Sequence, residues 1–253
     1  MRNYETQFDA RTKLAERLLF PVSAIEQNGI EDARFVRFTD GGGAARYYAT
    51  YTAYDGKNIL SQLLETDDFL HFAMRSLSGG MTANKGLALF PRKIGGRHQP
   101  DAPHQPDARY AMLARTDGEN IYIMFSNDLY TWNEGTLLAA PQYPWEFMQL
   151  GNCGSPIEID EGWLVLTHGV GLVRTYSIGA LLLDKDDPAT VIGRLPEPLI
   201  VPGEQEQGGY VPGVVYTCGA LLHQGRLIIP YGSADRAIAF TSVAVKELVG
   251  NMR

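Results

Sequence analysis

The sequence predicts an all-β protein, a propeller assembled from about four repeated sheets. Two observations lead to this prediction: short apolar runs bounded by turn-forming residues dominate the chain, and a unit of about sixty residues recurs along it. The 253 residues are enough for one large β domain with a sizeable core. The 27 glycines and 14 prolines are too many for a helical bundle.

The first element is the exception to this pattern. Apolar side chains recur at helical spacing through residues 4–19, so the sequence predicts a helix there, ahead of Pro21. We therefore expect residues 1–22 to form an N-terminal helix or linker and residues 23–253 to form the propeller domain.

The rest of the chain consists of apolar or alternating runs of four to nine residues. Examples are RYYATYTAY, IYIMFS, GWLVLTHGV and YSIGALLLD, each bounded by Gly, Asp, Asn or Pro. Runs of this length with such boundaries are typical of β-strands.

Acidic residues mark the repeat. Asp68, Asp128, Asp187 and Glu247 are separated by 60, 59 and 60 residues. Each unit holds about four short strands, which is the content of a propeller blade. A β-sandwich is the alternative, but it does not require a sixty-residue period.

A second series of positions follows the first strand of each unit. Because the first strand of a blade lines the central channel, we expect Asp32, Lys85, Asn152 and Tyr216 to converge there although they are far apart in sequence.

Composition excludes several classes of function. A net charge of −7 argues against a nucleic-acid or anionic-membrane surface, and no apolar run is long enough to span a bilayer. The charged N-terminal stretch does not resemble a secretory signal, so we expect a soluble, cytoplasmic protein. Cys153 and Cys218 give neither a disulfide framework nor the spacing of a metal site. The duplicated HQPDA at residues 98–108 could suggest a metal site, but a small duplication at a hairpin tip explains it better.

Seven motifs, in order, resemble those of glycoside hydrolase family 130: GIEDARF, NKGLALFPRKIGG, YAMLAR, IYIMFSNDLYTW, GNCGSPIEIDEGWLVLTHGV, YSIGALLLDKDDPATVIGR and VVYTCGALL. The family comprises inverting β-mannoside phosphorylases and some β-mannosidases on a five-bladed propeller. Its members carry about one more blade before the motif that corresponds to EDAR, so this chain resembles the C-terminal four blades. We therefore expect an incomplete ring, with the exposed flank of the first blade covered by the N-terminal helix or by a second chain.

The resemblance implies roles for four side chains around the sugar. Asp32 matches the general acid, whose proton is thought to reach the leaving oxygen through a hydroxyl of the bound mannosyl unit. Arg34 matches a residue that holds the site or the sugar, Asn84 lies beside the pocket, and Asp235 matches an acid that binds sugar hydroxyls.

The resemblance also implies a phosphate site. Lys85, Arg115, His168 and Tyr176 match the set that binds and orients phosphate. Family hydrolases tend to lose this basic set and activate water with a carboxylate. Its presence here favours phosphorolysis.

We therefore expect inverting phosphorolysis of β-1,2- or β-1,4-manno-oligosaccharides to α-mannose 1-phosphate. The implied partners are the β-linked oligosaccharide and inorganic phosphate as co-substrate, with no cofactor and no metal. An inverting β-mannosidase and an inactive sugar-binding propeller remain as alternatives, and self-association into a homo-oligomer stays open.

Overall fold

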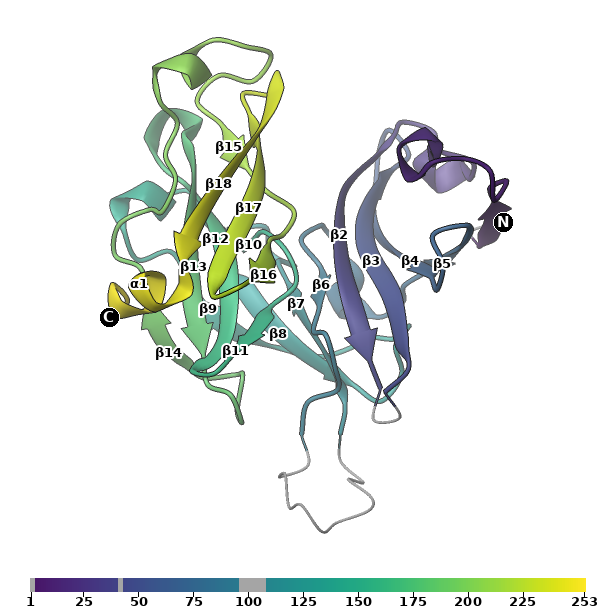
Figure 1. The fold of residues 1–253 in the computed structure, drawn as a ribbon, viewed down its shortest axis with the longest axis horizontal. Coiled ribbons are helices and arrows are strands. Elements are labelled where there is room, and N and C mark those ends of the chain that lie inside the picture. Colours follow the sequence, from purple (N-terminus) through teal and green to yellow (C-terminus); the bar gives the residue numbers. More distant parts are fainter. Residues whose placement is uncertain (1–2, 41–42, 96–107) are drawn as a thin grey trace.

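The computed structural model describes residues 3–40, 43–95 and 108–253. Four antiparallel sheets stand side by side around a common centre, in a four-bladed propeller arrangement (Figure 1). The duplicated HQPDA segment falls almost wholly in residues 96–107, outside the described residues.

The first and second sheets are antiparallel, and strands that pair in them are consecutive in the chain, except that the first strand of the chain pairs with the fifth. The first sheet has the order β1-β5-β4-β3-β2, with β1 (Tyr4–Gln7), β2 (Ile30–Thr39), β3 (Ala45–Tyr54), β4 (Ile59–Thr66) and β5 (His71–Ser76). The second contains β6 (Ala88–Leu89), β7 (Tyr110–Ala114), β8 (Ile121–Ser126) and β9 (Gly135–Ala139).

In the third and fourth sheets the innermost strand is split into two pieces that pair with the same neighbour. The third contains β10 (Gln149–Asn152), β11 (Ile157–Ile159), β12 (Gly162–Val170), β13 (Tyr176–Leu183) and β14 (Val191–Arg194). The fourth contains β15 (Val215–Tyr216), β16 (Leu221–His223), β17 (Arg226–Ser233) and β18 (Ala237–Ala244), followed by the short helix α1 (Val245–Gly250).

The sixty-residue period corresponds to these sheets. Asp68, Asp128 and Asp187 lie in the turns after β4, β8 and β13, where their carboxylates accept backbone amides. Glu247 follows β18 in the same place. All four acidic positions therefore mark the end of the third strand in their sheet.

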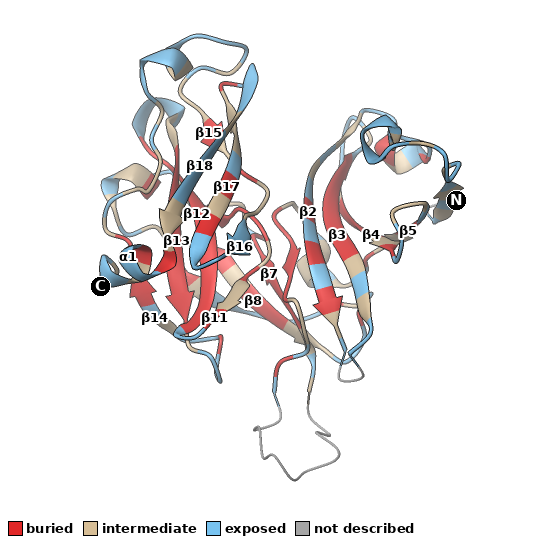
Figure 2. Ribbon diagram, in the orientation of Figure 1, coloured by how far each residue is buried: buried red, intermediate tan, exposed pale blue. Residues whose placement is uncertain are grey.

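Buried apolar side chains fill three interfaces between neighbouring sheets (Figure 2). The central sheets are covered on both faces. On β12, Trp163 and Val165 pack toward the second sheet, whereas Leu164 and Leu166 pack toward the fourth. A strand buried on both sides reads as a continuous apolar run, which explains GWLVLTHGV.

The predicted N-terminal helix is wrong. Residues Tyr4–Gln7 form β1 and pair with β5, and the later part of the segment contains a single turn of 3-10 helix at Leu14–Glu16. The outer edge of β5 offers unpaired backbone groups, so strand pairing outweighs the helical spacing of the side chains. Tyr4, Phe8 and Leu19 still cover the outer face of the first sheet, as expected of this segment, but from an extended chain.

Glu26 attaches this segment to the first sheet. Its fully buried carboxylate accepts hydrogen bonds from the Tyr4 and Tyr51 hydroxyls and from the Val22 and Ser23 amides. Burial alone would raise the pKa of Glu26, but the hydrogen bond from Tyr51 and those from the backbone outweigh it and lower the pKa below 4.5.

We expect Glu26→Gln to lower the free energy of unfolding by about 1–3 kcal/mol at neutral pH, because buried donors lose a charged acceptor. A depressed pKa stabilises the fold fully above pH 4.5, and this contribution is lost as the pH falls further. The gap between the two proteins in denaturant titrations should therefore shrink below pH 4.5.

Glu16→Gln is the matched control, because Glu16 makes the same local bond to the Lys13 amide but is exposed. We expect it to change stability by less than about 0.5 kcal/mol. Equal losses in the two variants would show that the buried contacts of Glu26 contribute nothing.

Candidate active site

A β-bulge in β2 shapes the centre of the molecule. The pairing of β2 with β3 shifts between Glu31 and Arg34, and Asp32 between them has a φ of 59°. Glu31 and Arg34 are three residues apart on β2, but their partners on β3, Thr52 and Thr50, are only two residues apart. Glu31 and Arg34 therefore share one face of the sheet. Aspartate adopts this left-handed conformation more readily than most residues.

Arg34 joins three sheets through one buried guanidinium. Its Nε donates to the Cys153 carbonyl at 2.8 Å, beyond β10 in the third sheet. Its Nη2 donates to the Tyr216 hydroxyl at 2.7 Å, on β15 of the fourth sheet, and lies 3.3 Å from Asp32 Oδ2. The first, third and fourth sheets thus meet at Asp32.

Tyr216 and Cys218 complete the surroundings of Asp32. The Tyr216 hydroxyl lies 3.4 Å from Asp32 Oδ2, and Cys218 Sγ lies 3.9 Å from Oδ1. Burial raises the pKa of Tyr216, and burial raises the pKa of Cys218 to about 12, so both groups keep their protons. Because Arg34 can only donate, the Tyr216 oxygen accepts from it, and the phenolic proton is available to Asp32.

A second pair of polar side chains, Arg115 and His168, lies beside the pair formed by Arg34 and Tyr216. Arg115, just after β7, places Nη1 2.9 Å from Nε2 of His168 on β12. His168 is 2% exposed and Arg115 is also buried. The His168 ring lies edge-on to Tyr216, with 5.0 Å between ring centres, so the two pairs are contiguous.

The charge state and tautomer of His168 follow from its surroundings. Burial, and next the positive charges of Arg115, Arg34 and Lys85, lower the pKa of His168 well below 6.5, so the ring is neutral at pH 7. Arginine has no acceptor, so Nε2 must accept and Nδ1 must carry the proton. Within the described parts of the chain, His168 Nδ1 and Arg115 Nε are buried without a hydrogen-bond partner. Two donors are thus unsatisfied beside a cluster of positive charge.

The remaining phosphate-site candidates border this cluster. Tyr176, at the start of β13, stacks on His168 with ring centres 6.0 Å apart. Lys85 Nζ forms an ion pair of 2.9 Å with Glu31, which the bulge turns toward the second sheet. Asn84 precedes it, with a φ of 68°, and its Oδ1 accepts the Lys85 amide.

Asp235 is the candidate with the fewest described contacts. It is exposed in the turn between β17 and β18, and among the described residues no hydrogen bond or ion pair joins it to the cluster. Gln149, which was not predicted, lies 3.4 Å from His168. Tyr216 was expected near the axis from its place in the repeat, but its contacts with Asp32 and Arg34 were not.

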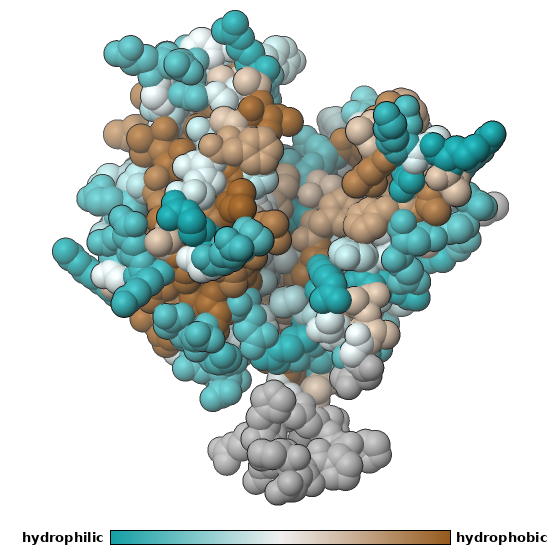
Figure 3. Space-filling model, viewed as in Figure 1, coloured by the Kyte–Doolittle hydropathy of each residue, from teal (hydrophilic) through white to brown (hydrophobic). Residues whose placement is uncertain are grey.

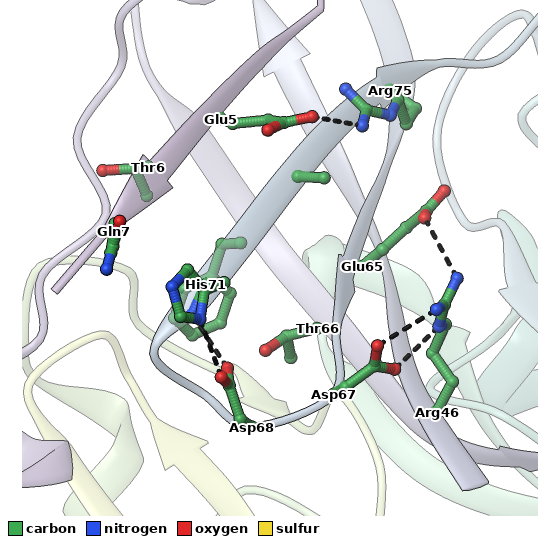
Figure 4. Close-up of a pocket in the computed structure, with 12 residues that line it drawn as sticks. Glu5, Thr6, Gln7, Arg46, Glu65, Thr66, Asp67, Asp68, His71 and Arg75 are labelled. Atoms are coloured by element: carbon green, nitrogen blue, oxygen red, sulfur yellow. Dashed lines mark hydrogen bonds and ion pairs between the residues drawn. The ribbon is translucent and has the colours of Figure 1, made fainter. Parts of the chain in front are cut away.

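A separate pocket lies on the outer strands of the first sheet (Figure 4). Its charged side chains pair with one another: Arg75 with Glu5, Arg46 with Asp67, and His71 with Asp68. These side chains already have partners, whereas the central cluster holds buried donors that have none among the described residues.

The described residues contain no group of three His, Cys, Asp or Glu side chains placed to hold a metal ion. No helix among them is both long enough and apolar enough to cross a lipid bilayer.

Comparison with known proteins then decides the family. The family 130 glycoside hydrolase model, described as beta-1,4-mannooligosaccharide phosphorylase, matches residues 6–253. The chain belongs to glycoside hydrolase family 130.

Two curated relatives and one solved structure are informative. A 1,2-beta-oligomannan phosphorylase from Thermoanaerobacter sp. strain X514 is 31% identical over 228 residues, covering 88% of this chain and 71% of that protein. A beta-1,4-mannooligosaccharide phosphorylase from Ruminococcus albus is 34% identical over 219 residues, covering 81% and 61%. The structure of a beta-1,2-mannobiose phosphorylase from Listeria innocua, in complex with beta-1,2-mannobiose, has a TM-score of 0.77 at 28% identity, covering 92% and 63%. This family 130 chain thus spans roughly two thirds of the length of these relatives.

We expect nitrogen NMR of this family 130 chain to show His168 as a neutral ring with the proton on Nδ1 at pH 7. The ring should remain neutral as the pH is lowered through 6.5, because burial and three cations oppose protonation. The exposed His223 provides a reference signal in the same spectra. A proton on Nε2, or titration of His168 near pH 6.5, would contradict this assignment.

Proposed function

We propose that the chain catalyses inverting phosphorolysis of β-linked manno-oligosaccharides to α-mannose 1-phosphate. The observation that supports this best is the buried Arg115–His168 pair, whose Nε and Nδ1 donors have no partner among the described residues. Buried donors without partners are costly, and an anion such as phosphate would satisfy them. The phosphorylase names of the relatives support the same reaction.

In the proposed reaction an oxygen of phosphate attacks the anomeric carbon while the glycosidic bond to the leaving sugar breaks. Lys85, Arg115, His168 and Tyr176 would hold the phosphate and offset its negative charge. Asp32 would supply the proton that the leaving oxygen needs, on the opposite face of the ring. Phosphate is then a co-substrate, and the mechanism involves no cofactor.

The two carboxylate oxygens of Asp32 have different partners. Arg34 and Tyr216 contact the same oxygen, Oδ2, whereas Oδ1 has the weaker thiol contact of Cys218. We assign Oδ1 as the oxygen that faces the sugar. Arg34 and Asn84 would border the sugar, and Asp235 would reach its hydroxyls from the β17–β18 turn.

The relatives act on β-1,2 and β-1,4 linkages, so both are candidate substrates. A reaction that consumes inorganic phosphate suits the cytoplasm, the location expected from the sequence.

A hydrolase would instead need a carboxylate that activates water. The side chains that lower the pKa of His168 are all cationic, which favours binding of an anion over activation of water.

Turnover of β-1,2- or β-1,4-mannobiose should require added phosphate and yield mannose 1-phosphate. Arg115→Ala should raise the KM for phosphate at least tenfold and the KM for the mannoside less than about threefold, because it removes one cation from the phosphate site. Arg37→Ala, at an exposed position on the same strand as Asp32, is the control and should leave both constants unchanged. Release of free mannose without phosphate would favour the mannosidase, and sugar binding without turnover would favour the inactive propeller.

Tyr216→Phe should lower kcat at least about tenfold. The variant keeps the ring beside His168 but removes the hydroxyl that donates to ionised Asp32, and a hydrogen bond to an ionised group contributes about 1.5–3 kcal/mol. Tyr231→Phe, on β17, is the matched control. An unchanged kcat in Tyr216→Phe would show that the hydroxyl does not act on Asp32.

A further inference from the structure

The turn between β12 and β13, residues 171–175, differs from its counterparts in the first two sheets. The β3–β4 and β7–β8 turns read DGKN and DGEN, at residues 55–58 and 117–120. In both of them the aspartate accepts two backbone amides and the glycine has a positive φ. The β12–β13 turn reads GLVRT and has neither an acidic side chain nor a glycine in the left-handed region.

Two consecutive residues of this turn have a strained backbone. Val173 and Arg174 have φ values of 58° and 57°. For a β-branched residue this conformation is an outlier that costs free energy, whereas glycine adopts it freely. Packing does not hold Val173 in place, because it is 98% exposed. Strain of this kind is typical of ligand clamps and switch regions, so the side chains of the turn call for a functional explanation.

The turn joins the two strands that carry His168 and Tyr176. β12 ends two residues after His168, and β13 begins with Tyr176, whose ring stacks on His168. Arg174 precedes Tyr176 by two residues, which is at most about 7 Å of chain. His168, whose buried Nδ1 has no partner among the described residues, therefore lies at the base of the turn.

Arg174 brings a cation without a partner to this place. Its side chain is exposed, and none of the residues that the structure describes forms a hydrogen bond or an ion pair with it. A guanidinium has five donors in a planar arrangement that matches two oxygens of a phosphate. A phosphate that accepts from His168 Nδ1 has further oxygens for other donors, and the long side chain of Arg174 is attached close enough to supply them.

Exposed apolar side chains flank the turn. Leu172 and Val173 are 68% and 98% exposed, and before β10 Phe147 and Met148 are 66% and 56% exposed. The two segments are adjacent, because the Met148 amide donates to the carbonyl of Val170 at the end of β12. Figure 3 shows the surface hollowed between the two lobes, with apolar colour bordering the hollow on the side of the third and fourth sheets. Apolar side chains that close over an anion site exclude water from it and strengthen its hydrogen bonds.

We propose that the β12–β13 turn is a flap that closes over bound phosphate, with Arg174 donating to the phosphate oxygens and Leu172 and Val173 excluding water. The inference rests on the proposed function, because it adds a residue and a movement to the proposed phosphate site. It also explains the composition of the turn. An aspartate like those of the first two sheets would repel the anion, whereas this turn supplies a positive charge.

The first test measures the two Michaelis constants. Arg174→Ala should raise the KM for phosphate at least about fivefold and the KM for mannobiose less than about twofold, because the lost cation contacts phosphate alone. Arg174→Lys keeps the charge and should recover part of this loss. Arg236→Ala is the matched control and should leave both constants unchanged. Arg236 is also exposed, lies in the β17–β18 turn, and has no side-chain partner among the residues described.

The second test measures closure by amide hydrogen exchange with inorganic phosphate as the only added ligand. Saturating phosphate should slow the exchange of the amides at residues 171–175 at least about threefold in the wild type, and should not slow it in Arg174→Ala. This measurement needs no sugar, so it reports the flap whether or not the chain turns over a mannoside.

The two tests distinguish failure of the flap from failure of the proposed function. Phosphate-dependent turnover with equal phosphate KM values in the wild type and Arg174→Ala would overturn the flap and leave the proposed function in place. A raised KM without slower exchange would also overturn it, because Arg174 would then bind phosphate without closure. If the wild type turns over no mannoside, the exchange decides: protection by phosphate that Arg174→Ala abolishes supports the flap, and absence of protection overturns it.

Discussion

The centre of the molecule depends on one buried cation. Arg34 lies on the first sheet, yet its donors reach a carbonyl of the third and a hydroxyl of the fourth, so three sheets converge on a single guanidinium. A buried charge is costly unless its donors are satisfied, and each partner of Arg34 is fixed by the start of a different blade. The contacts of Arg34 therefore fix both the arrangement of the sheets and the position of Asp32.

Much of this architecture could be predicted from the sequence because it is periodic. Turns after the third strand need an acidic side chain to accept backbone amides, so Asp68, Asp128 and Asp187 recur at nearly constant spacing. The N-terminal segment could not be predicted in the same way. Its apolar spacing suits a helix, but pairing with β5 and the buried carboxylate of Glu26 exist only once the first sheet has formed.

The candidate site also has a part that the sequence predicts and a part that only the fold explains. Asp32, Arg34, Arg115 and His168 were predicted as site residues because they match positions in the motifs of the family. Which atoms meet was not predictable: the unpartnered Nδ1 of His168 follows from the 2.9 Å contact of Nε2 with Arg115, a contact between residues 53 positions apart. The role of Tyr216 likewise needs the fold, because Tyr216 and Asp32 lie at opposite ends of the chain.

The bulge at Asp32 makes the length of this stretch as important as its composition. Deleting Ala33 would restore regular pairing with β3 and leave Asp32 as the single residue between Glu31 and Arg34, so its side chain would face the other side of the sheet, away from Arg34. The aspartate and the arginine would both survive in such a sequence, yet the contact between them would be lost. In a sequence alignment, a gap of one position here would therefore mark a changed site geometry, even where every aligned residue is the same.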